Sequence, residues 1–557
     1  MLTMKDMMSK YRRKFGIIPL IVFAGFCAFM LMYWITSQGT GVSPDSTTYI
    51  EAARSLIAGN GFFAHGKVMT RYPPGYPILI GAVDLLHPGD VLQATRFLAA
   101  LFFGANLVLL GLAVHLCTKR SLVATVCAML LFLFSAPTIS VHSMAWTEAP
   151  FITFSMASFL LFSFYVPRPR LYVLVLASLM LGFAAATRYV GVVLFPTIAL
   201  AFFLLDNRSL RLKIRDIVIF VGVASLPLVS WLIRNILIAQ SATNREFAFH
   251  PVGLSHAKNM IFTLGNFVLP IPIAPLIKAI CVAVVVAFLF CGILFIYRKV
   301  YSKQDATPTS IVFSVLCVMY TVIYVVFLFI SISFFEAHTP LDNRILLPAI
   351  LALASAGIIL AWSLSEELNR HWIWYGFVLL VVFSVSINMI PAIATAVGIH
   401  KNGRGYTSRY WNNSDIIAYL SDTHEIRTIY SNGSDVIRFL TGKEAVIIPA
   451  KVSSSTLRMN EDYEEKLNQM VQECSEGKAL IVYFNTITWR WYLPSIEEIE
   501  ARDNLPVLRK TQDGVIYGTR LNLTPGGEIQ AERERRNSDT LHFKDPVTLK
   551  HKQICAE

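Results

Sequence analysis

Residues 15–36 read FGIIPLIVFAGFCAFMLMYWIT, a run without a charged side chain. About 20 apolar residues in a helix cross the hydrocarbon core of a bilayer, so this run is long enough to span it. It follows the basic segment Lys10-Tyr-Arg-Arg-Lys14 and has no small-residue cleavage signature. The stretch therefore predicts an uncleaved membrane anchor whose N-terminal side faces the cytoplasm.

Comparable apolar runs recur through the first 394 residues of this 557-residue chain. With 55% hydrophobic and only 15% charged residues, the composition excludes a soluble enzyme. We predict an all-α polytopic membrane domain of roughly eleven transmembrane helices, followed by a small α/β domain. Beyond the first run, spans are expected at about 92–117, 121–140, 150–166, 171–187, 190–205, 217–240, 279–297, 309–333, 345–363 and 372–394.

The formal net charge of +12 comes from the membrane part of the chain. Residues 1–394 hold 27 basic and 14 acidic residues, whereas residues 395–557 hold 21 and 22. Basic residues concentrated in the short loops on one side follow the positive-inside rule, so we exclude nucleic acid as a partner. Of eight cysteines, six lie in apolar stretches, which leaves too few for a disulfide framework or a metal site.

The alternation of spans places five segments on the outer side: 38–90, 141–149, the surroundings of Arg188, 241–278 and 334–344. An odd number of spans places the C-terminal part outside as well. There the apolar runs shorten to strand length and alternate with helical patterns, which predicts an extracytoplasmic α/β domain over 395–523. The charged stretch 524–557 is predicted to be a flexible tail.

The first outer segment contains the most informative acidic residue, Asp45. Tyr49, Ala52, Ala53, Leu56 and Ile57 share one helical face after it, and Gly59 is placed to stop the helix. An amphipathic helix at the membrane interface is the expected result. Ionisable groups near a bilayer are functional candidates, yet an aspartate after a proline is also a good N-cap, so both roles stay open for Asp45.

Asp45, Tyr49 and the run Pro73-Pro74-Gly75-Tyr76-Pro77 resemble the GT-C superfamily of membrane glycosyltransferases. The nearest likeness is to protein O-mannosyltransferases and lipid A aminoarabinose transferases, and it covers roughly residues 10–395. Further motifs in the same order are Trp146-Thr-Glu-Ala-Pro150, Gly182-Phe-Ala-Ala-Ala-Thr-Arg188, Trp231-Leu-Ile-Arg-Asn235 and Arg344-Ile-Leu-Leu-Pro348.

The resemblance implies an inverting transferase that moves a sugar from a polyprenyl-phosphate donor to an acceptor hydroxyl at the outer face. It makes Asp45 the general base, a role that needs one carboxylate to take the acceptor proton. Cations must hold the departing phosphate, and Arg188, Arg234 and Arg344 are the candidates. Snorkelling, or pairing with Glu336 or Asp342, is the structural alternative for these arginines.

Tyr49, Arg71 and Tyr76 are predicted to belong to the substrate loop. Glu148 lies where the family carries its second acidic residue and could orient the acceptor or a cation; a carboxylate favoured by the helix dipole at an N-terminus is the alternative, and we favour the functional role. Because Ser46 follows Asp45 and Glu148 stands alone, a divalent-metal mechanism, which usually needs two carboxylates, is disfavoured. We predict no cofactor and no metal ligands, without excluding a divalent ion.

A plasma-membrane protein with an external active face is the expected localisation, and membrane lipids are expected partners. Which sugar moves, and whether the acceptor is a lipid, a glycan or a protein, does not follow from the residues. Two other functions stay open: a transporter or flippase that uses the same charged outer cavity, and a non-catalytic scaffold. Against the first, the charged candidates gather at one membrane surface and the chain shows no repeated halves.

Overall fold

The structure is a computed structural model that describes residues 16–86, 89–271, 273–301, 307–423, 427–503 and 505–519. The basic N-terminal segment and the predicted tail 524–557 lie outside these residues. The described chain divides into two compact units. The first contains the residues up to Ile417 with 435–442 and 452–459, and the second contains 418–434, 443–451 and the residues from Asn460 onward.

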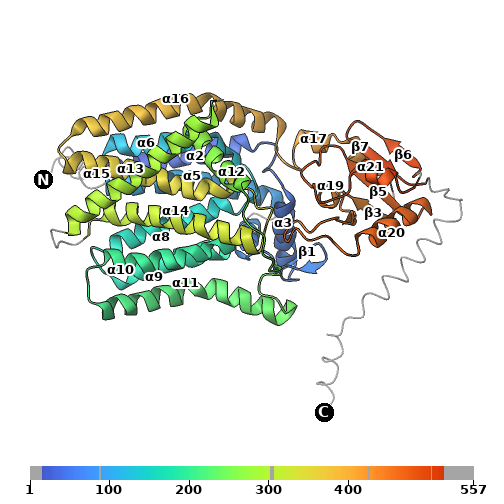
Figure 1. The fold of residues 1–557 in the computed structure, drawn as a ribbon, viewed down its shortest axis with the longest axis horizontal. Helices are drawn as coiled ribbons and strands as arrows, with labels where there is room; N and C mark the ends of the chain where they lie inside the picture. The colour runs from blue at the N-terminus through green and yellow to red at the C-terminus, as the bar shows by residue number, and fades with distance from the viewer. Residues whose placement is uncertain are drawn as a thin grey trace, which may run out of the picture. The chain divides into compact units, whose positions relative to one another are not determined.

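The first unit is built from helices whose long axes run side by side (Figure 1). The amphipathic helix α3 (Pro44–Ile57) follows α2 (Ile18–Ile35). Gly59, with φ of +79°, lies just after the end of α3 and stops the helix there, as predicted. In chain order the other helices are α4 (Gly75–Leu86), α5 (Val91–Cys117), α6 (Leu122–Leu133), α7 (Ala136–His142), α8 (Glu148–Tyr165), α9 (Leu171–Thr187), η1 (Tyr189–Val193), α10 (Leu194–Leu205), α11 (Leu210–Ala239), α12 (Leu254–Val268), α13 (Pro275–Tyr301), α14 (Thr309–Phe334), α15 (Asn343–Glu367), α16 (His371–Asn402) and α17 (Arg409–Asn412).

Eight of these helices are long and apolar enough to cross a membrane, or nine if one bent pair counts as a single span. Every predicted span coincides with helix. Two of them, α9 and the η1–α10 segment, are apolar but shorter than the eight. The polytopic helical fold class is therefore confirmed.

The predicted span 121–140 is wrong as a single helix. It breaks into α6 and α7, which meet at an angle of 63°. Ser135 caps the second piece by accepting a hydrogen bond from the Thr138 amide, and Pro137 occupies its first turn. A serine N-cap followed by proline starts a new helix rather than continuing the old one.

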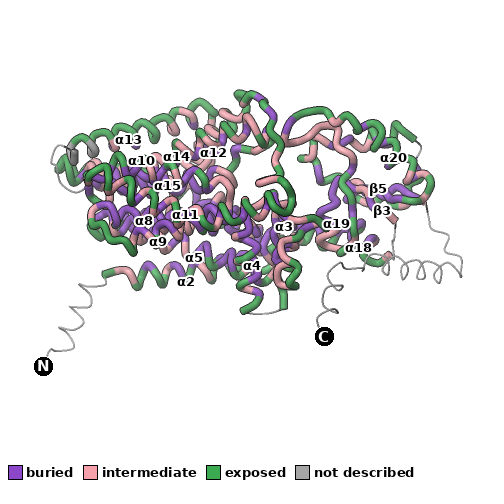
Figure 2. The backbone as a smooth tube through the Cα atoms, turned by 90° about the horizontal axis from the view of Figure 1, so that it is seen from below, coloured by how far each residue is buried: buried purple, intermediate pink, exposed green. Residues whose placement is uncertain are grey.

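The interior of the first unit is formed by α5, α8 and α15, whereas α13 and α16 are peripheral. Within their apolar windows, 72% of α8 and of α15 is buried but only 17% of α13 and of α16. Figure 2 shows α8 mostly in the colour of buried residues and α13 mostly in that of exposed residues. Large side chains such as Phe159, Phe162 and Tyr320 are fully buried in this core. The peripheral helices expose apolar side chains, as lipid-facing helices do.

The second unit contains a five-stranded sheet in the order β4-β3-β5-β7-β6. The strands are β3 (Thr428–Ser431), β4 (Ala445–Ile447), β5 (Ala479–Phe484), β6 (Val507–Lys510) and β7 (Gly514–Tyr517). The first three are parallel and the last two antiparallel. Helix α20 (Tyr463–Ser475) buries Leu467, Met470 and Cys474 in the core that it shares with the sheet, which confirms the predicted small α/β region. Helix α21 (Ile496–Glu500) also belongs to the second unit, whereas α18 (Asp415–Asp422) is divided between the units and α19 (Ser434–Thr441) belongs to the first apart from Ser434.

Candidate functional site: a carboxylate–arginine cluster

A short set of backbone hydrogen bonds aligns the loops that carry the predicted residues. The Gly41 amide donates to Ser143 O, and the Ala145 amide donates to Gly41 O, each at 2.9 Å. On the other side of the same segment, the Tyr406 amide donates to Val42 O at 2.8 Å. These contacts fix the chain just before Asp45 against the chain just before Glu148.

Asp45 lies in the first turn of α3, but it is not the N-cap. Ser43 is the cap, since its side chain accepts from the Ser46 amide. The Asp45 carboxylate instead faces the site: Tyr72 Oη donates to its Oδ1 at 2.7 Å, and Arg344 Nη2 lies 2.8 Å from its Oδ2. The structure therefore rejects the interpretation of Asp45 as a cap.

The electrostatic surroundings keep Asp45 ionised. Burial alone would raise the pKa of this carboxyl. The Arg344 guanidinium, the Tyr72 hydroxyl and the more distant Arg188 outweigh burial and hold the pKa below its ordinary value. The pKa of the Tyr72 hydroxyl is raised, first by burial and then by the charge of Asp45, so Tyr72 keeps its proton and donates it in the hydrogen bond.

Glu148 opens α8 and its side chain is fully buried, with 0% exposure. Its Oε1 accepts a hydrogen bond of 2.7 Å from Arg344 Nε and forms an ion pair with Arg188 Nη1. Its Oε2 is buried and has no hydrogen-bond partner among the described residues. Arg344 thus bridges two carboxylates, and the cluster holds two acids and two arginines.

Trp146 and Thr147 complete the walls of this cluster. The Arg344 guanidinium lies 4.3 Å from the centre of the Trp146 ring, a cation–π contact. Trp146 Nε1 in turn donates to Ser43 Oγ at 2.8 Å. Thr147 Oγ1 accepts from Arg188 Nη1 at 3.1 Å. Arg344 is therefore restrained on three sides.

The predicted substrate-loop tyrosines form an aromatic group behind Asp45. The Tyr49 ring meets Tyr72 and Tyr76 edge to face, with centroid distances of 5.1 and 5.6 Å. Burial raises the pKa of Tyr49, and the neighbouring Asp45 charge raises it further, so this phenol stays neutral. Tyr49 and Tyr76 are buried and support the site from within.

Arg71, also predicted for the substrate loop, belongs to a neighbouring group. Its Nη2 lies 2.8 Å from Glu336 Oε1, and Arg245 Nε lies 3.6 Å from the same oxygen. Burial alone would lower the pKa of Arg71, but the charges of Glu336 and Asp45 hold it above its ordinary value. Two arginines therefore share one carboxylate close to Asp45, which leaves an excess of positive charge.

Arg234 does not join the Asp45–Glu148 cluster in any contact that the structure records. Its Nη1 donates to Met69 O at 2.8 Å, and its guanidinium lies 4.5 Å from the centre of the Trp231 ring. Tyr189 Oη, another residue of this region, donates to Thr70 O at 2.9 Å. Arg234 and Tyr189 hold the backbone that leads into Arg71 and Tyr72.

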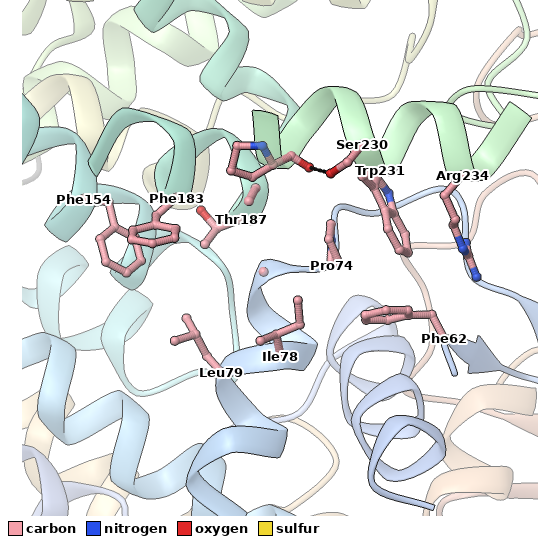
Figure 3. A pocket seen from close by; sticks show the side chains of 13 residues that line it. Phe62, Pro74, Ile78, Leu79, Phe154, Phe183, Thr187, Ser230, Trp231 and Arg234 are labelled. Atoms are coloured by element: carbon pink, nitrogen blue, oxygen red, sulfur yellow. Dashed lines mark hydrogen bonds between the residues drawn. The ribbon is translucent and has the colours of Figure 1, made fainter. Parts of the chain in front are cut away.

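Arg234 also borders an apolar cavity of about 500 Å³ formed by α4, α8, α9 and α11 (Figure 3). Phe62 and Trp231 line the end next to Arg234, and Phe154, Phe183 and Leu79 line the other end. Thr187, which precedes Arg188, is part of the wall.

His142 has an ordinary hydrogen-bonding environment. Its Nδ1 lies 2.8 Å from Thr138 O, and its Nε2 lies 3.0 Å from Asn106 Nδ2. The Asn106 amide also donates to Ala149 O, next to Glu148. Within the described ranges, no group of three or more His, Cys, Asp or Glu side chains is arranged to hold a metal ion.

Three residues that contact the predicted site residues were not themselves predicted from the sequence: Tyr72, Arg245 and Trp146. Tyr72 stands between Arg71 and the proline pair, so its position in the motif was a usable signal. Trp146 stood in a quoted motif without a role. Arg245 lies in a loop with no pattern around it, and only its approach to Glu336 reveals it.

The first unit is thus a bundle of apolar helices in which two carboxylates and two arginines from distant parts of the chain come together. Residues 71–233 match the family model described as dolichyl-phosphate-mannose-protein mannosyltransferase. This segment contains Glu148 and Arg188, whereas Asp45 and Arg344 lie outside it. A search of curated proteins found no match.

Among solved structures, the chain is similar to ArnT from Cupriavidus metallidurans bound to undecaprenyl phosphate, with a TM-score of 0.53 and 12% identity over 92% of this chain and 99% of that one. The apo form of the same ArnT gives 0.53 and 13%, over 91% and 98%. At this identity the likeness concerns the fold. The predicted resemblance to the GT-C superfamily is confirmed.

Proposed function

We propose that this protein is an inverting glycosyltransferase that transfers a sugar from a polyprenyl-phosphate donor to an acceptor hydroxyl at the outer face of the membrane. The observation that carries the proposal is the bridge from Arg344 to both Asp45 and Glu148. The matched family model and the GT-C fold support a transferase with a lipid-linked donor. An N-terminus in the cytoplasm and an external C-terminal unit follow from the charge distribution of the loops.

Asp45 is the proposed general base. An ionised, half-exposed carboxylate, with 29% of its side chain accessible, is ready to accept a proton from an approaching hydroxyl. Its low pKa makes it a weak base in the resting site. If the donor phosphate draws Arg344 away from Asp45, the carboxylate loses its main stabilising charge, and its basicity rises when the substrate is in place.

The leaving phosphate carries negative charge that cations must hold, and arginine does this by bidentate hydrogen bonding. Arg188 and Arg344 are balanced by carboxylates, whereas the ion pairs of Arg71 and Arg245 within the described ranges both go to Glu336. We propose that the phosphate binds between Arg344 and the Arg71–Arg245 pair. Arginine side chains supply the positive charge in this mechanism, and no step is assigned to a metal.

The apolar cavity bordered by Arg234 is the proposed seat of the first prenyl units of the donor. Its walls are aromatic and aliphatic, and the guanidinium at one end suits a chain that carries a phosphate (Figure 3). Arg234 lies at this end of the cavity, where we propose that it contacts the phosphate. Its hydrogen bond to Met69 O also positions the loop that carries Arg71. The proposed role of Glu148 in orienting the acceptor is indirect, because its side chain is fully buried and its Oε1 holds Arg188 and Arg344 in place.

The test is transfer by the purified full-length protein in lipid vesicles, supplied with radiolabelled polyprenyl-phosphate sugars and extracted envelope acceptors. Loss of label from the lipid into a glycosidic product in the parent, with none in Asp45→Asn, is the expected result. Movement of the donor across the vesicle without a new glycosidic bond would reject the transferase and favour the flippase. Donor binding without turnover would favour the scaffold.

A further inference from the structure

The second unit contains a cavity of about 420 Å³ beside β3, β4 and α20. Tyr430 and Tyr463 contribute aromatic rings to its wall, and Tyr430 is held there because its hydroxyl donates to Glu473 at 2.9 Å. Asn460 and Gln469 contribute amides, each of which already donates one hydrogen bond within the unit, to Ala450 O at 2.6 Å and to Glu473 Oε1 at 2.8 Å. The cavity therefore combines ring faces with neutral hydrogen-bonding groups.

The charged residues of this cavity cancel each other. Asp462 and Lys466 both line it, and they form an ion pair with one another across one helical turn. One positive and one negative side chain lie on the same wall, so the lining has no net charge that would attract an anion or a cation. The lining thus favours an uncharged ligand with hydroxyl groups or amides.

Exposed aromatic residues lie in a loop that is hydrogen-bonded to the segment following the cavity wall. The Lys451 amide donates to Tyr492 O at 2.8 Å, which places the loop 486–494 beside Ala450 of the cavity wall. This loop exposes Trp489 by 48% and Trp491 by 45%. Large aromatic rings at a protein surface are typical of binding surfaces, because they combine an apolar face with a polar edge.

We propose that this cavity and the adjoining tryptophans bind a neutral segment of a glycan. A pyranose ring has C–H faces that pack against aromatic rings and a rim of hydroxyls that pairs with amide groups, which matches the wall. The inference rests on the proposed function only in identifying the glycan as the acceptor or the product of transfer. Binding itself does not require catalysis.

A peptide is the main competing ligand, because β4 is the edge strand of the sheet and an edge strand can pair with a peptide. However, β4 spans only Ala445–Ile447, and Pro449 follows with no N–H to donate. A strand added there gains few backbone hydrogen bonds. The lining of the cavity therefore favours a glycan over a peptide.

The experiment measures retention of the full-length protein, in a detergent without a sugar headgroup, on an array of neutral and anionic oligosaccharides. All proteins carry Asp45→Asn, so a failure of the proposed transfer chemistry leaves the binding readout intact. Gln469→Trp fills the cavity, and Gln472→Trp is its matched control. Gln472 lies on the same helix outside the cavity wall, where its amide donates to Glu476 at 2.7 Å.

Retention on at least one neutral oligosaccharide is expected, with affinity about tenfold weaker in Gln469→Trp and unchanged within about twofold in Gln472→Trp. If Gln469→Trp does not fold, Gln469→Ala removes the amide without adding volume and weakens binding in the same direction. Three results would overturn the proposal: no retained neutral glycan, equal loss in both tryptophan variants, or a peptide library retained through the same cavity in place of glycans.

Discussion

Replacing Glu148 by glutamine removes one negative charge from the buried cluster and keeps its shape. The carboxylate has 0% exposure and is paired with both Arg188 and Arg344. Breaking a buried ion pair by removing one partner costs about 3–5 kcal/mol, because the other charge stays buried without compensation. In the variant, Arg344 still has its ion pair with Asp45, and Arg188, which is 14% exposed, still has its hydrogen bond to Thr147. We therefore expect the free energy of unfolding to fall by about 3 kcal/mol, at the lower end of that range.

The free energy of unfolding can be measured by titrating the detergent-solubilised protein with SDS and following tryptophan fluorescence. Arg188→Gln and the double variant complete a cycle. Since the two charges interact directly, the double variant should be less destabilised than the sum of the single variants, with a coupling of about 1–3 kcal/mol. Glu366→Gln is the control, because its pair with Lys119 is exposed and should contribute about 1 kcal/mol or less.

Two results together would refute this reasoning. The unfolding free energy of Glu148→Gln would stay within about 1 kcal/mol of the parent, and the effects of the two single variants would add up to that of the double variant. They would mean that the carboxylate is protonated, or that the arginines find other partners when the charge is removed.

Three further outcomes follow from the same contacts. Asp45→Asn should lower the single-turnover transfer rate about 10²–10⁴-fold while the protein stays folded, and an unchanged rate would reject the base. The pKa of Asp45 lies below its ordinary value of 3.8, so its contribution to stability persists above that pH and is lost as the pH falls through the folded-state pKa. In Arg344→Gln burial then raises that pKa, and residual transfer, followed against pH, should lose activity at a higher pH than in the parent. Tyr72→Phe removes one donor to the carboxylate and should shift the acid limb in the same direction but by less; no shift would show that the hydrogen bond is unimportant.

The helices were largely predictable because hydrophobic length is a local property. The expected spans 92–117 and 309–333 correspond to α5, Val91–Cys117, and α14, Thr309–Phe334. The failure at 121–140 arose because hydropathy averages over a window and does not register a cap. Ser135 and Pro137 are apolar enough in context to pass such an average, yet they start a new helix at an angle.

The type of each site residue and the loop that carries it could be identified from the sequence. The side chains that each residue contacts could not. Asp45 and Arg344 were expected in one outer pocket, and their side chains are in contact. The role of Ser43 as the cap, the hydrogen bond from Tyr72, and the sharing of Glu336 by Arg71 and Arg245 were not predictable. Each depends on which of several nearby groups a flexible side chain reaches.

From the sequence alone one could derive a polytopic helical membrane protein, an α/β unit near its C-terminus and a short set of ionisable residues near the ends of the apolar helices. Hydropathy and charge are properties of neighbouring residues, so no fold is needed to recognise them. Only the tertiary structure decided that Arg344 contacts Glu148, which is 196 residues away, and that Arg234 holds the Met69 backbone instead of joining the same cluster. Ion pairing depends on distances of a few ångströms in a buried environment, and those distances exist only after the helices have packed.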